Sequence, residues 1–527
     1  MTPENDDERR SFASRTPVND NPDKVVYRRG FVTRHQVTGW RFVMRRIASG
    51  VALHDTRMLV DPLRTQTRAV LMGILLVITA LVGCFVFSLI RPNGSAANSP
   101  VLADRSTAAL YVKVGDQLHP VLNLTSARLI VGRSVNPTTV KSSELDKFPR
   151  GNLIGIPGAP ERMVQNTAKD ANWTVCDAIS GAATGTTVIA GAPDSSGARA
   201  AALSAGHGVL VRNATSTWML WDGRRSRIDL SDHAVTGALG LGSDIPAPRP
   251  IAAGLFNAIP ESPPLSAPAI RDAGSPPRFG LPVSAPVGAV VEAHGLDSTS
   301  DPSAHAMLYY AVLPDGLQPI SPVLAAILRN SNSYGLDQPP RLGADQVAKL
   351  PVSRMLDTSR YPDQRISLVD AARDPVTCAH WSKPAGATTN SLTLLTGSAL
   401  PVPETVHTED LVGAGTGGTA SRVALAPGTG YFTATVGQNS ASPAAGSLYW
   451  VSDTGVRYGI DNEGGANMPA KTAEVLGLNS PPTPIPWSVL SLFAPGPTLS
   501  RADALLAHDG LAPDTRPGRS AAQGESR

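Results

Sequence analysis

The chain has 527 residues, of which roughly 430 follow one long hydrophobic stretch, enough for one large core or several small ones. Its 48 glycines and 46 prolines, with 5% aromatic residues, favour turns and short strands over long packed helices. The net charge of +3 is uneven: residues 1–68 hold 13 basic and 8 acidic side chains, whereas the rest holds 33 and 35. A basic arm suits an anionic membrane surface or an acidic partner, and the near-neutral remainder argues against binding to nucleic acid.

Residues 1–23 are polar without apolar periodicity, so we expect a disordered terminus. Residues 24–68 form a basic region in which Thr33 and Gln36 make a capping-box pattern, which predicts a helix start. The apolar residues that follow share one helical face, and three arginines lie off it. The face comprises Trp40, Val43, Ile47 and Val51, and the arginines are Arg41, Arg45 and Arg46.

This pattern predicts a basic amphipathic helix that ends at Asp61-Pro62. Such a helix lies on the inner leaflet or docks on a partner protein, and we expect its two faces to form a membrane-binding or partner-binding site. The alternative is a solvated helix with a small local core.

Residues 69–90 contain no charged side chain. As a helix they span roughly 33 Å, enough to cross a hydrocarbon core of about 30 Å. A cleaved signal peptide is the alternative, but its apolar region is shorter and lies nearer the N-terminus. The segment from Lys24 to Arg68 holds ten basic and two acidic residues, whereas only Arg91 precedes Asp104 beyond the span. The positive-inside rule therefore predicts a cytoplasmic N-terminus and an exported C-terminal part.

After an expected spacer at 91–106, the outer domain (107–500) contains segments that recur in one order. The first matching pair consists of two hairpin-like units. A second pair of hairpin-like units and a pair of Leu/Pro-rich closing segments follow in the same order. The pairs are Leu110–His119 with Leu308–Gln318, Trp218–Asp229 with Tyr449–Asp461, and Gly254–Leu265 with Ser488–Leu499. The repeated order predicts a duplication, hence an α+β pseudo-twofold body of four small strand-and-helix modules.

The first half of this body is expected at about 107–265 and the second at about 305–500. A Pro-rich connector is expected at about 244–300, and an extra loop at 401–436 belongs to the second half. Residues 501–527 are expected to form a C-terminal tail.

Three cysteines are present. Cys84 lies in the span, where it serves as a small apolar residue. Cys176 and Cys378 occupy equivalent places in the two halves, so a pseudo-twofold would bring them close together in a compartment where disulfides persist. We predict that they are bonded; the alternative is two free buried thiols.

No catalytic signature is complete. The chain has no Gly-Lys dipeptide and therefore no Walker A motif. Gly413–Gly418 fits G-x-G-x-x-G, but it lies in the extra loop, where a flexible loop is the better interpretation. The histidines, among them His207, His233 and His380, show no metal-ligand spacing. The recurring Asp222, Asp229, Asp453 and Asp461 suit turns or caps. We predict no catalytic residue, no cofactor and no metal site.

The basic segment Tyr27–Arg46, the run Met58–Arg64 and a single span before a duplicated domain with one cysteine pair resemble the EccB family. EccB is a membrane component of the ESX, or type VII, secretion systems of mycobacteria and their relatives. The resemblance, from about residue 24 to 500, implies a single-pass inner-membrane protein. It also implies an elongated periplasmic body of four repeats around a central β-containing domain.

The resemblance further implies a structural scaffold that organises the periplasmic side of the translocon. The implied partners are EccC (the motor ATPase), EccD, EccE, further copies of the chain itself and, in some systems, the mycosin protease. Members of the family are often labelled ATPases, so an ATPase subunit stays as an alternative. A cell-wall-binding module is a second alternative, because repeated exported domains often bind glycan.

Overall fold

The computed structural model describes residues 33–54, 57, 62–90, 99–181, 183–294, 307–413, 418–437, 446–461 and 471–510. It divides into two compact units, Met1–Asn93 and Gly94–Arg527. Three segments singled out in the sequence lie outside the described residues: the expected disordered terminus, most of the Met58–Arg64 run, and the middle of the glycine-rich motif.

The described residues of the first unit form two long helices, α1 (Arg34–Leu53) and α2 (Pro62–Ile90). The capping box forms as predicted: Thr33 Oγ1 accepts from the Gln36 amide, and Gln36 Oε1 accepts from the Thr33 amide at 2.9 Å. The predicted helix end at Asp61-Pro62 is wrong. Helix α1 stops at Leu53, because His54 takes a left-handed conformation with φ of 52° that ends the helix.

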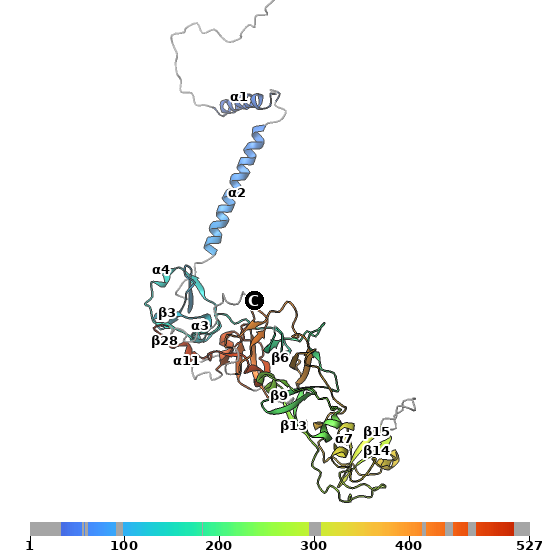
Figure 1. The fold of residues 1–527 in the computed structure, drawn as a ribbon. Coiled ribbons are helices and arrows are strands. Elements are labelled where there is room, and N and C mark those ends of the chain that lie inside the picture. The colour runs from blue at the N-terminus through green and yellow to red at the C-terminus, as the bar shows by residue number, and fades with distance from the viewer. Residues whose placement is uncertain are drawn as a thin grey trace, which may run out of the picture. The chain divides into compact units, whose positions relative to one another are not determined.

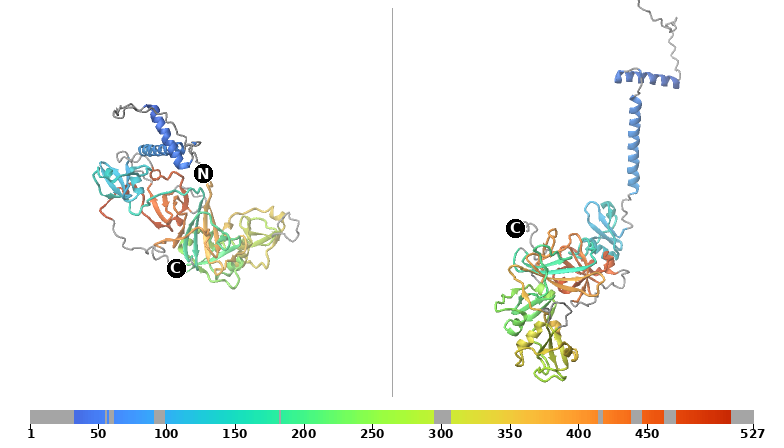
Figure 2. Two further views of the ribbon diagram at one scale, coloured as in Figure 1. Left: turned by 90° about the horizontal axis from the view of Figure 1, so that it is seen from above. Right: turned by 90° about the vertical axis from the view of Figure 1, so that its right-hand side faces the viewer.

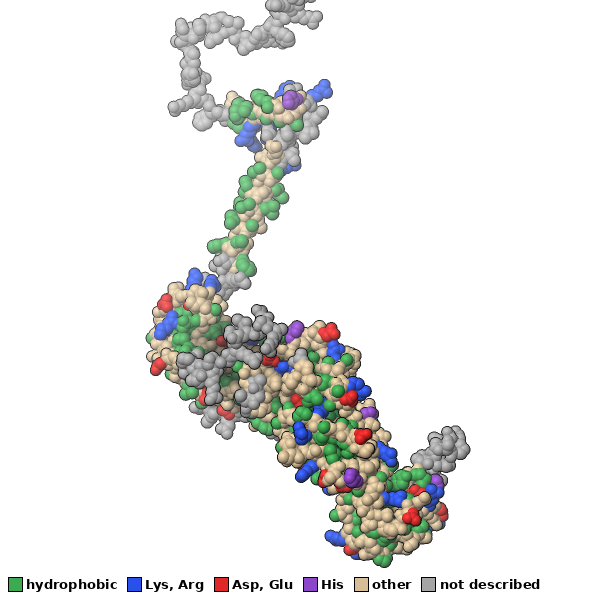
Figure 3. Space-filling model, viewed as in Figure 1, with side chains coloured by type: hydrophobic (Ala, Val, Ile, Leu, Met, Phe, Trp, Pro, Cys, Tyr) green, Lys and Arg blue, Asp and Glu red, His purple; other side chains and the backbone are tan. Residues whose placement is uncertain are grey.

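Helix α2 holds the candidate membrane span. It begins at Pro62, which fits the first turn of a helix, where a missing amide proton costs nothing. Gln66–Phe87 is the one stretch, among the residues that the structure describes, that is long and apolar enough to cross a membrane. Its side chains are exposed, and Figure 3 shows the hydrophobic ones along the helix and Lys and Arg around α1.

The second unit contains four modules of one topology. Each begins with three antiparallel strands and a helix. A fourth strand then pairs in parallel with the first, and after a short helix the chain pairs in parallel with the third. This shared order confirms the predicted mixed α+β fold with four strand-and-helix repeats.

The elements of the modules are as follows. The first module is β1 (Val101–Asp104), β2 (Leu110–Val114), β3 (Gln117–Val121), α3 (Leu124–Val131), β4 (Thr138–Val140), α4 (Ser142–Leu145) and β5 (Leu153–Ile154). The second is β9 (His207–Asn213), β10 (Ser216–Trp221), β11 (Arg224–Ile228), α5 (His233–Leu239), β12 (Arg249–Pro250), α6 (Ala253–Ala258) and β13 (Glu261–Leu265). The third is β14 (Val290–His294), β15 (Met307–Leu313), β16 (Gly316–Ile320), α7 (Pro322–Ser331), β17 (Arg341–Leu342) and α8 (Ala344–Val347). The fourth is β23 (Tyr431–Val436), β24 (Leu448–Val451), β25 (Val456–Ile460), α9 (Thr472–Leu476), β26 (Thr483–Pro486), α10 (Trp487–Leu490) and β27 (Ala494–Pro495).

A central sheet joins the two halves, in the order β21-β22-β7-β6-β19-β20-β8. Its strands are β6 (Ala171–Ala178), β7 (Gly185–Ala190), β8 (Ala201–Ala202), β19 (Val376–Lys383), β20 (Ser391–Gly397), β21 (Glu409–Asp410) and β22 (Arg422–Ala424). The antiparallel pair β6 and β19 lies in the middle, flanked by the hairpin partner of each strand. Each half also adds a strand to the hairpin of the other half, β8 on β20 and β22 on β7, so the halves are interlocked.

The modules pack in pairs that mix the halves. Leu129 of α3 and Leu476 of α9 belong to one core shared by the first and fourth modules. Leu239 of α5 and Leu324 of α7 belong to another, shared by the second and third. In Figures 1 and 2 the first module, in cyan, lies beside the fourth, in orange and red. A pseudo-twofold that exchanges the first module with the third and the second with the fourth turns one of these pairs into the other, so the two pairs are consistent with it.

Four expected boundaries differ from the structure. The extra loop expected at 401–436 contains β21 and β22 of the central sheet and β23, the first strand of the fourth module. The spacer at 91–106 includes β1, whose four residues are too few to show a period of two. The Pro-rich connector at 244–300 includes β12 and β13 of the second module. These are edge strands, where proline is tolerated because no ladder partner needs its amide.

The C-terminal tail at 501–527 begins with folded structure, α11 (Arg501–Ala504) and β28 (Ala507–His508). Strand β28 pairs with β5 of the first module, and His508 Nε2 lies 2.8 Å from the Gly155 carbonyl oxygen. The remaining short elements are β18 (Ser367–Leu368), which pairs with β9, and a 3-10 turn at Thr358–Arg360.

Candidate functional sites

Helix α1 carries the residues predicted to bind a membrane or a partner, namely Trp40, Arg41, Val43, Arg45, Arg46 and Ile47. With 100° per residue, Trp40, Val43 and Ile47 fall on one face, and each exposes more than half of its side chain. Arg41, Arg45 and Arg46 lie on the same helix away from that face. An apolar stripe that the described chain leaves exposed is available to another surface. Val37 and Met44, which sequence reasoning missed, lie on the same side by the same geometry.

The two outer cysteines lie directly opposite each other on β6 and β19, where the halves meet. Their sulfur atoms form a disulfide, with Cα atoms 4.0 Å apart and 202 residues of sequence between them. Both residues are fully buried in a small cluster with Ile189 and Leu395. Cys84 in α2 is a free, exposed cysteine. The bond therefore fastens one half of the body to the other.

The histidines singled out in the sequence do not come together. His233 begins α5 and His207 begins β9, and both are exposed. His380 on β19 is largely buried, and burial lowers its pKa below the usual value; its Nδ1 lies 2.9 Å from Thr174 Oγ1. Among the described residues no three His, Cys, Asp or Glu side chains are grouped as metal ligands.

The recurring aspartates serve turns. Asp222 with Gly223 forms a two-residue hairpin turn, with φ of 42° and 71°, typical of a type I′ turn. Asp229 accepts from the amide and hydroxyl of Ser231, and Asp453 accepts from the Gly428 amide at 2.8 Å. Side-chain acceptors of this kind hold a loop in place.

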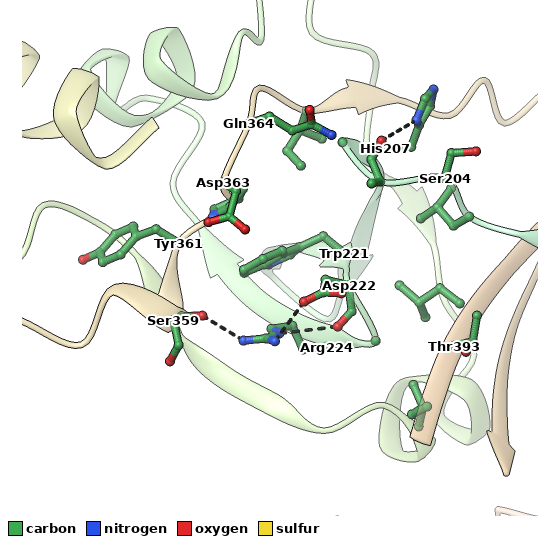
Figure 4. Close-up of a pocket in the computed structure, with 18 residues that line it drawn as sticks. Ser204, His207, Trp221, Asp222, Arg224, Ser359, Tyr361, Asp363, Gln364 and Thr393 are labelled. Atoms are coloured by element: carbon green, nitrogen blue, oxygen red, sulfur yellow. Dashed lines mark hydrogen bonds and ion pairs between the residues drawn. The ribbon is translucent and has the colours of Figure 1, made fainter. Parts of the chain in front are cut away.

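The turn at Asp222-Gly223 lines a pocket of about 600 Å³ (Figure 4). The pocket lies between the second module, strand β20 and the segment before β18. Arg224 is held there: it donates to Asp222 Oδ2 and to the Ser359 carbonyl oxygen, both at 2.9 Å, and lies 4.8 Å from the Trp221 ring centre. The positive charge of this guanidinium is already paired with a carboxylate of the protein. The pocket therefore has the size of a ligand site without a prepared phosphate cradle.

Two arginines that sequence reasoning missed fasten short helices. Arg457 on β25 donates to the carbonyl oxygens of Leu490, Ser491 and Phe493 at the end of α10. Arg225, at the equivalent position on β11, donates to those of Phe256 and Ile259 at the end of α6. Both arginines occupy the same place in the repeated sequence units, which is the signal that could have revealed them.

Comparison with known proteins gives a consistent result. The family model described as "Type VII secretion system ESX-1, transport TM domain B" matches residues 29–513. A relative from Mycobacterium tuberculosis H37Rv, named ESX-3 secretion system ATPase EccB3, is 73% identical over 521 residues, which cover 98% of this chain and 96% of the relative.

Solved structures agree along most of the chain. A chain of an intact ESX-5 inner membrane complex is 37% identical with a TM-score of 0.70, covering 94% of this chain and 99% of that one. A chain of an EccB3 dimer from the ESX-3 core complex is 60% identical with a TM-score of 0.68, covering 78% of this chain and 100% of that one.

Proposed function

The chain belongs to the EccB family of type VII secretion systems, and from that premise we propose that it is a structural subunit of the inner-membrane secretion complex. The observation that carries the proposal is the likeness to a chain of an intact ESX-5 inner membrane complex over 94% of the sequence. The span and the duplicated body thus correspond to parts of an assembled machine. We place this chain in an assembly with EccC, EccD and EccE and with further copies of itself, and with the mycosin protease where a system has one.

The proposed topology follows from charge and redox chemistry. The ten basic residues before the span keep the N-terminus in the cytoplasm, and the Cys176–Cys378 disulfide suits the oxidising side of the membrane. The second unit then works in the periplasm. Its interlocked halves and paired modules give neighbours a fixed surface, which is what a scaffold supplies.

The related protein's name includes "ATPase", which keeps an enzymatic role as the second candidate. Hydrolysis of a nucleotide needs donors around the phosphates and a positioned metal ion. This sequence contains no Gly-Lys dipeptide, and the pocket at the Asp222 turn engages its arginine with Asp222 and Ser359. These observations favour the structural role over the enzymatic one.

Helix α1 is proposed to fasten the cytoplasmic side of the complex through its exposed stripe and its arginines. Reversing three charges together, Arg41→Glu, Arg45→Glu and Arg46→Glu, is expected to release the protein from the complex. It is expected to leave the protein in the membrane, because α2 is unchanged. Co-purification of the other subunits with a tagged chain, and extraction of membranes at high pH, measure the two effects separately.

The matched control reverses three exposed arginines of the modules, Arg105→Glu, Arg133→Glu and Arg354→Glu, which changes the net charge equally. Co-purification should persist in this control. Unchanged recovery of the other subunits with the α1 variant would remove the anchoring role of this helix.

A further inference from the structure

The paired strands of the second and fourth modules can be aligned residue by residue. The alignment shows one position at which the two modules differ in the size and charge of a side chain. In both modules one strand pairs in parallel with the first strand, β12 with β9 and β26 with β23. The residue that precedes a proline in this strand can be compared between the two modules. Arg249 pairs with Val211 in the second module, and Thr483 pairs with Thr433 in the fourth. Because Val211 and Thr433 face the equivalent Trp218 and Tyr449, Arg249 and Thr483 occupy the same position.

In the second module this position is filled from within the chain. The Arg249 side chain is buried and donates to the carbonyl oxygen of Asp374, in the segment that leads into β19. Asp177, itself buried on β6, supplies the opposing negative charge: burial lowers the pKa of Arg249, and the Asp177 carboxylate acts against that lowering. In the second module the protein itself therefore supplies both the buried cation, Arg249, and the anion that opposes it, Asp177.

In the fourth module the shorter Thr483 lines a pocket of about 600 Å³. Three segments line it: Gln165–Lys169 before β6, the turn Lys383–Ala387 after β19, and Ser480–Pro484 leading into β26. This volume lies within the usual range for small-molecule sites, and the walls are mainly apolar, as such sites are.

The walls of this pocket are stiff. Four prolines contribute to them, and proline fixes the backbone φ angle. The side-chain amide of Gln165 bonds both the amide and the carbonyl of Ser480, and Asp170 Oδ1 accepts from the Ala385 amide at 2.8 Å. The pocket is therefore formed before any ligand arrives, which reduces the entropy cost of binding.

The charged side chains that line the pocket are both lysines. Lys169 and Lys383 line it, and no lining residue is Asp or Glu. The carboxylate of the neighbouring Asp170 is turned to the Ala385 amide. Within the described part of the chain neither lysine takes part in an ion pair. Two cationic side chains thus line the pocket, and the carboxylate of Asp170 at its wall is engaged by a backbone amide.

We propose that this pocket binds a small organic oxyanion, with its apolar body against the prolines and its charged head group between Lys169 and Lys383. The ligand would supply both the volume and the negative charge that Arg249 and Asp177 supply in the other half. Lysine suits such a head group because its ammonium is a point charge with three donors.

The test uses the full chain in lipid nanodiscs with two probes of equal shape, 2-naphthoate, which is an anion, and neutral 2-naphthamide. Acetylation of individual lysines, followed by mass spectrometry, reports where each probe lies. At a naphthoate concentration about ten times its dissociation constant, the acetylation of Lys169 and Lys383 should slow about tenfold, because only the unoccupied fraction reacts, and naphthamide at the same concentration should not slow it. Lys141 and Lys349, on other modules, serve as internal controls.

Two variants sharpen the result. Lys169→Gln with Lys383→Gln should weaken calorimetric binding of naphthoate by about tenfold or more, whereas Lys141→Gln with Lys349→Gln should leave it unchanged. Thr483→Arg should abolish binding, because it places in the fourth module the side chain that fills the second. Equal protection by the neutral probe, or undiminished affinity in the lysine variant, would overturn the proposal.

Discussion

Replacing Cys176 and Cys378 together by alanine is expected to lower the free energy of unfolding of the second unit by up to about 5 kcal/mol. The disulfide closes a loop of 202 residues, so its loss frees a large part of the unfolded chain to expand. Both sulfur atoms are buried between β6 and β19, the strands at which the halves meet. The loss should therefore weaken the junction of the halves before it affects any single module.

Urea denaturation of the double variant, followed by tryptophan fluorescence, measures this loss. Cys84→Ala removes a cysteine that forms no disulfide and should leave the midpoint unchanged. Non-reducing peptide mapping of the wild type should yield a cross-linked peptide that contains Cys176 and Cys378. Two thiols that react with an alkylating reagent in the native protein would contradict the expectation.

Arg457→Ala is expected to destabilise the second unit by about 3 kcal/mol, because removal of the guanidinium leaves buried carbonyl oxygens without a donor. The three oxygens lie at and just after the end of α10; the Leu490 oxygen also accepts from the Phe493 amide, so the loss falls on the oxygens of Ser491 and Phe493. Leu490 and Phe493 are fully buried, so water cannot replace the lost donor easily. The guanidinium also lies 5.4 Å from the Trp487 ring centre, a contact that alanine removes as well.

The same denaturation experiment measures this effect, and hydrogen exchange locates it. Amides of α10 should exchange faster in Arg457→Ala, and Arg457→Lys should fall between the variant and the wild type because lysine lacks the planar fork. Arg354→Ala, at an exposed position, is the matched control. A loss no larger than that of the control would show that the carbonyl contacts contribute little.

The repeats were predictable because hairpins and caps are local. The two-residue turn at Asp222-Gly223 and the capping box at Thr33 each depend on residues close together in the sequence, and both form as the pattern indicates. The pairing of first with fourth and second with third modules was not predictable from one half alone. It depends on apolar helix faces, such as those of α3 and α9, that look alike in all modules.

The boundaries and the pocket show where local patterns fail. The prolines at 263–264 suggest a connector, yet they lie in the edge strand β13, where no partner needs their amides. The tail residues Ala507 and His508 have no strand pattern of their own and pair only because β5 presents an open edge. The contrast between Arg249 and Thr483 required the register of two sheets, which sequence comparison did not supply.

The central claim is that this chain holds neighbouring subunits in place and does not transform a molecule. Release of phosphate from Mg-ATP by the full chain, purified from native membranes free of the other subunits, tests it most directly. The structural role predicts a rate equal to that of a protein-free control. Saturable hydrolysis that a single substitution in one defined pocket abolishes, such as Arg224→Ala beside Asp222, would contradict it.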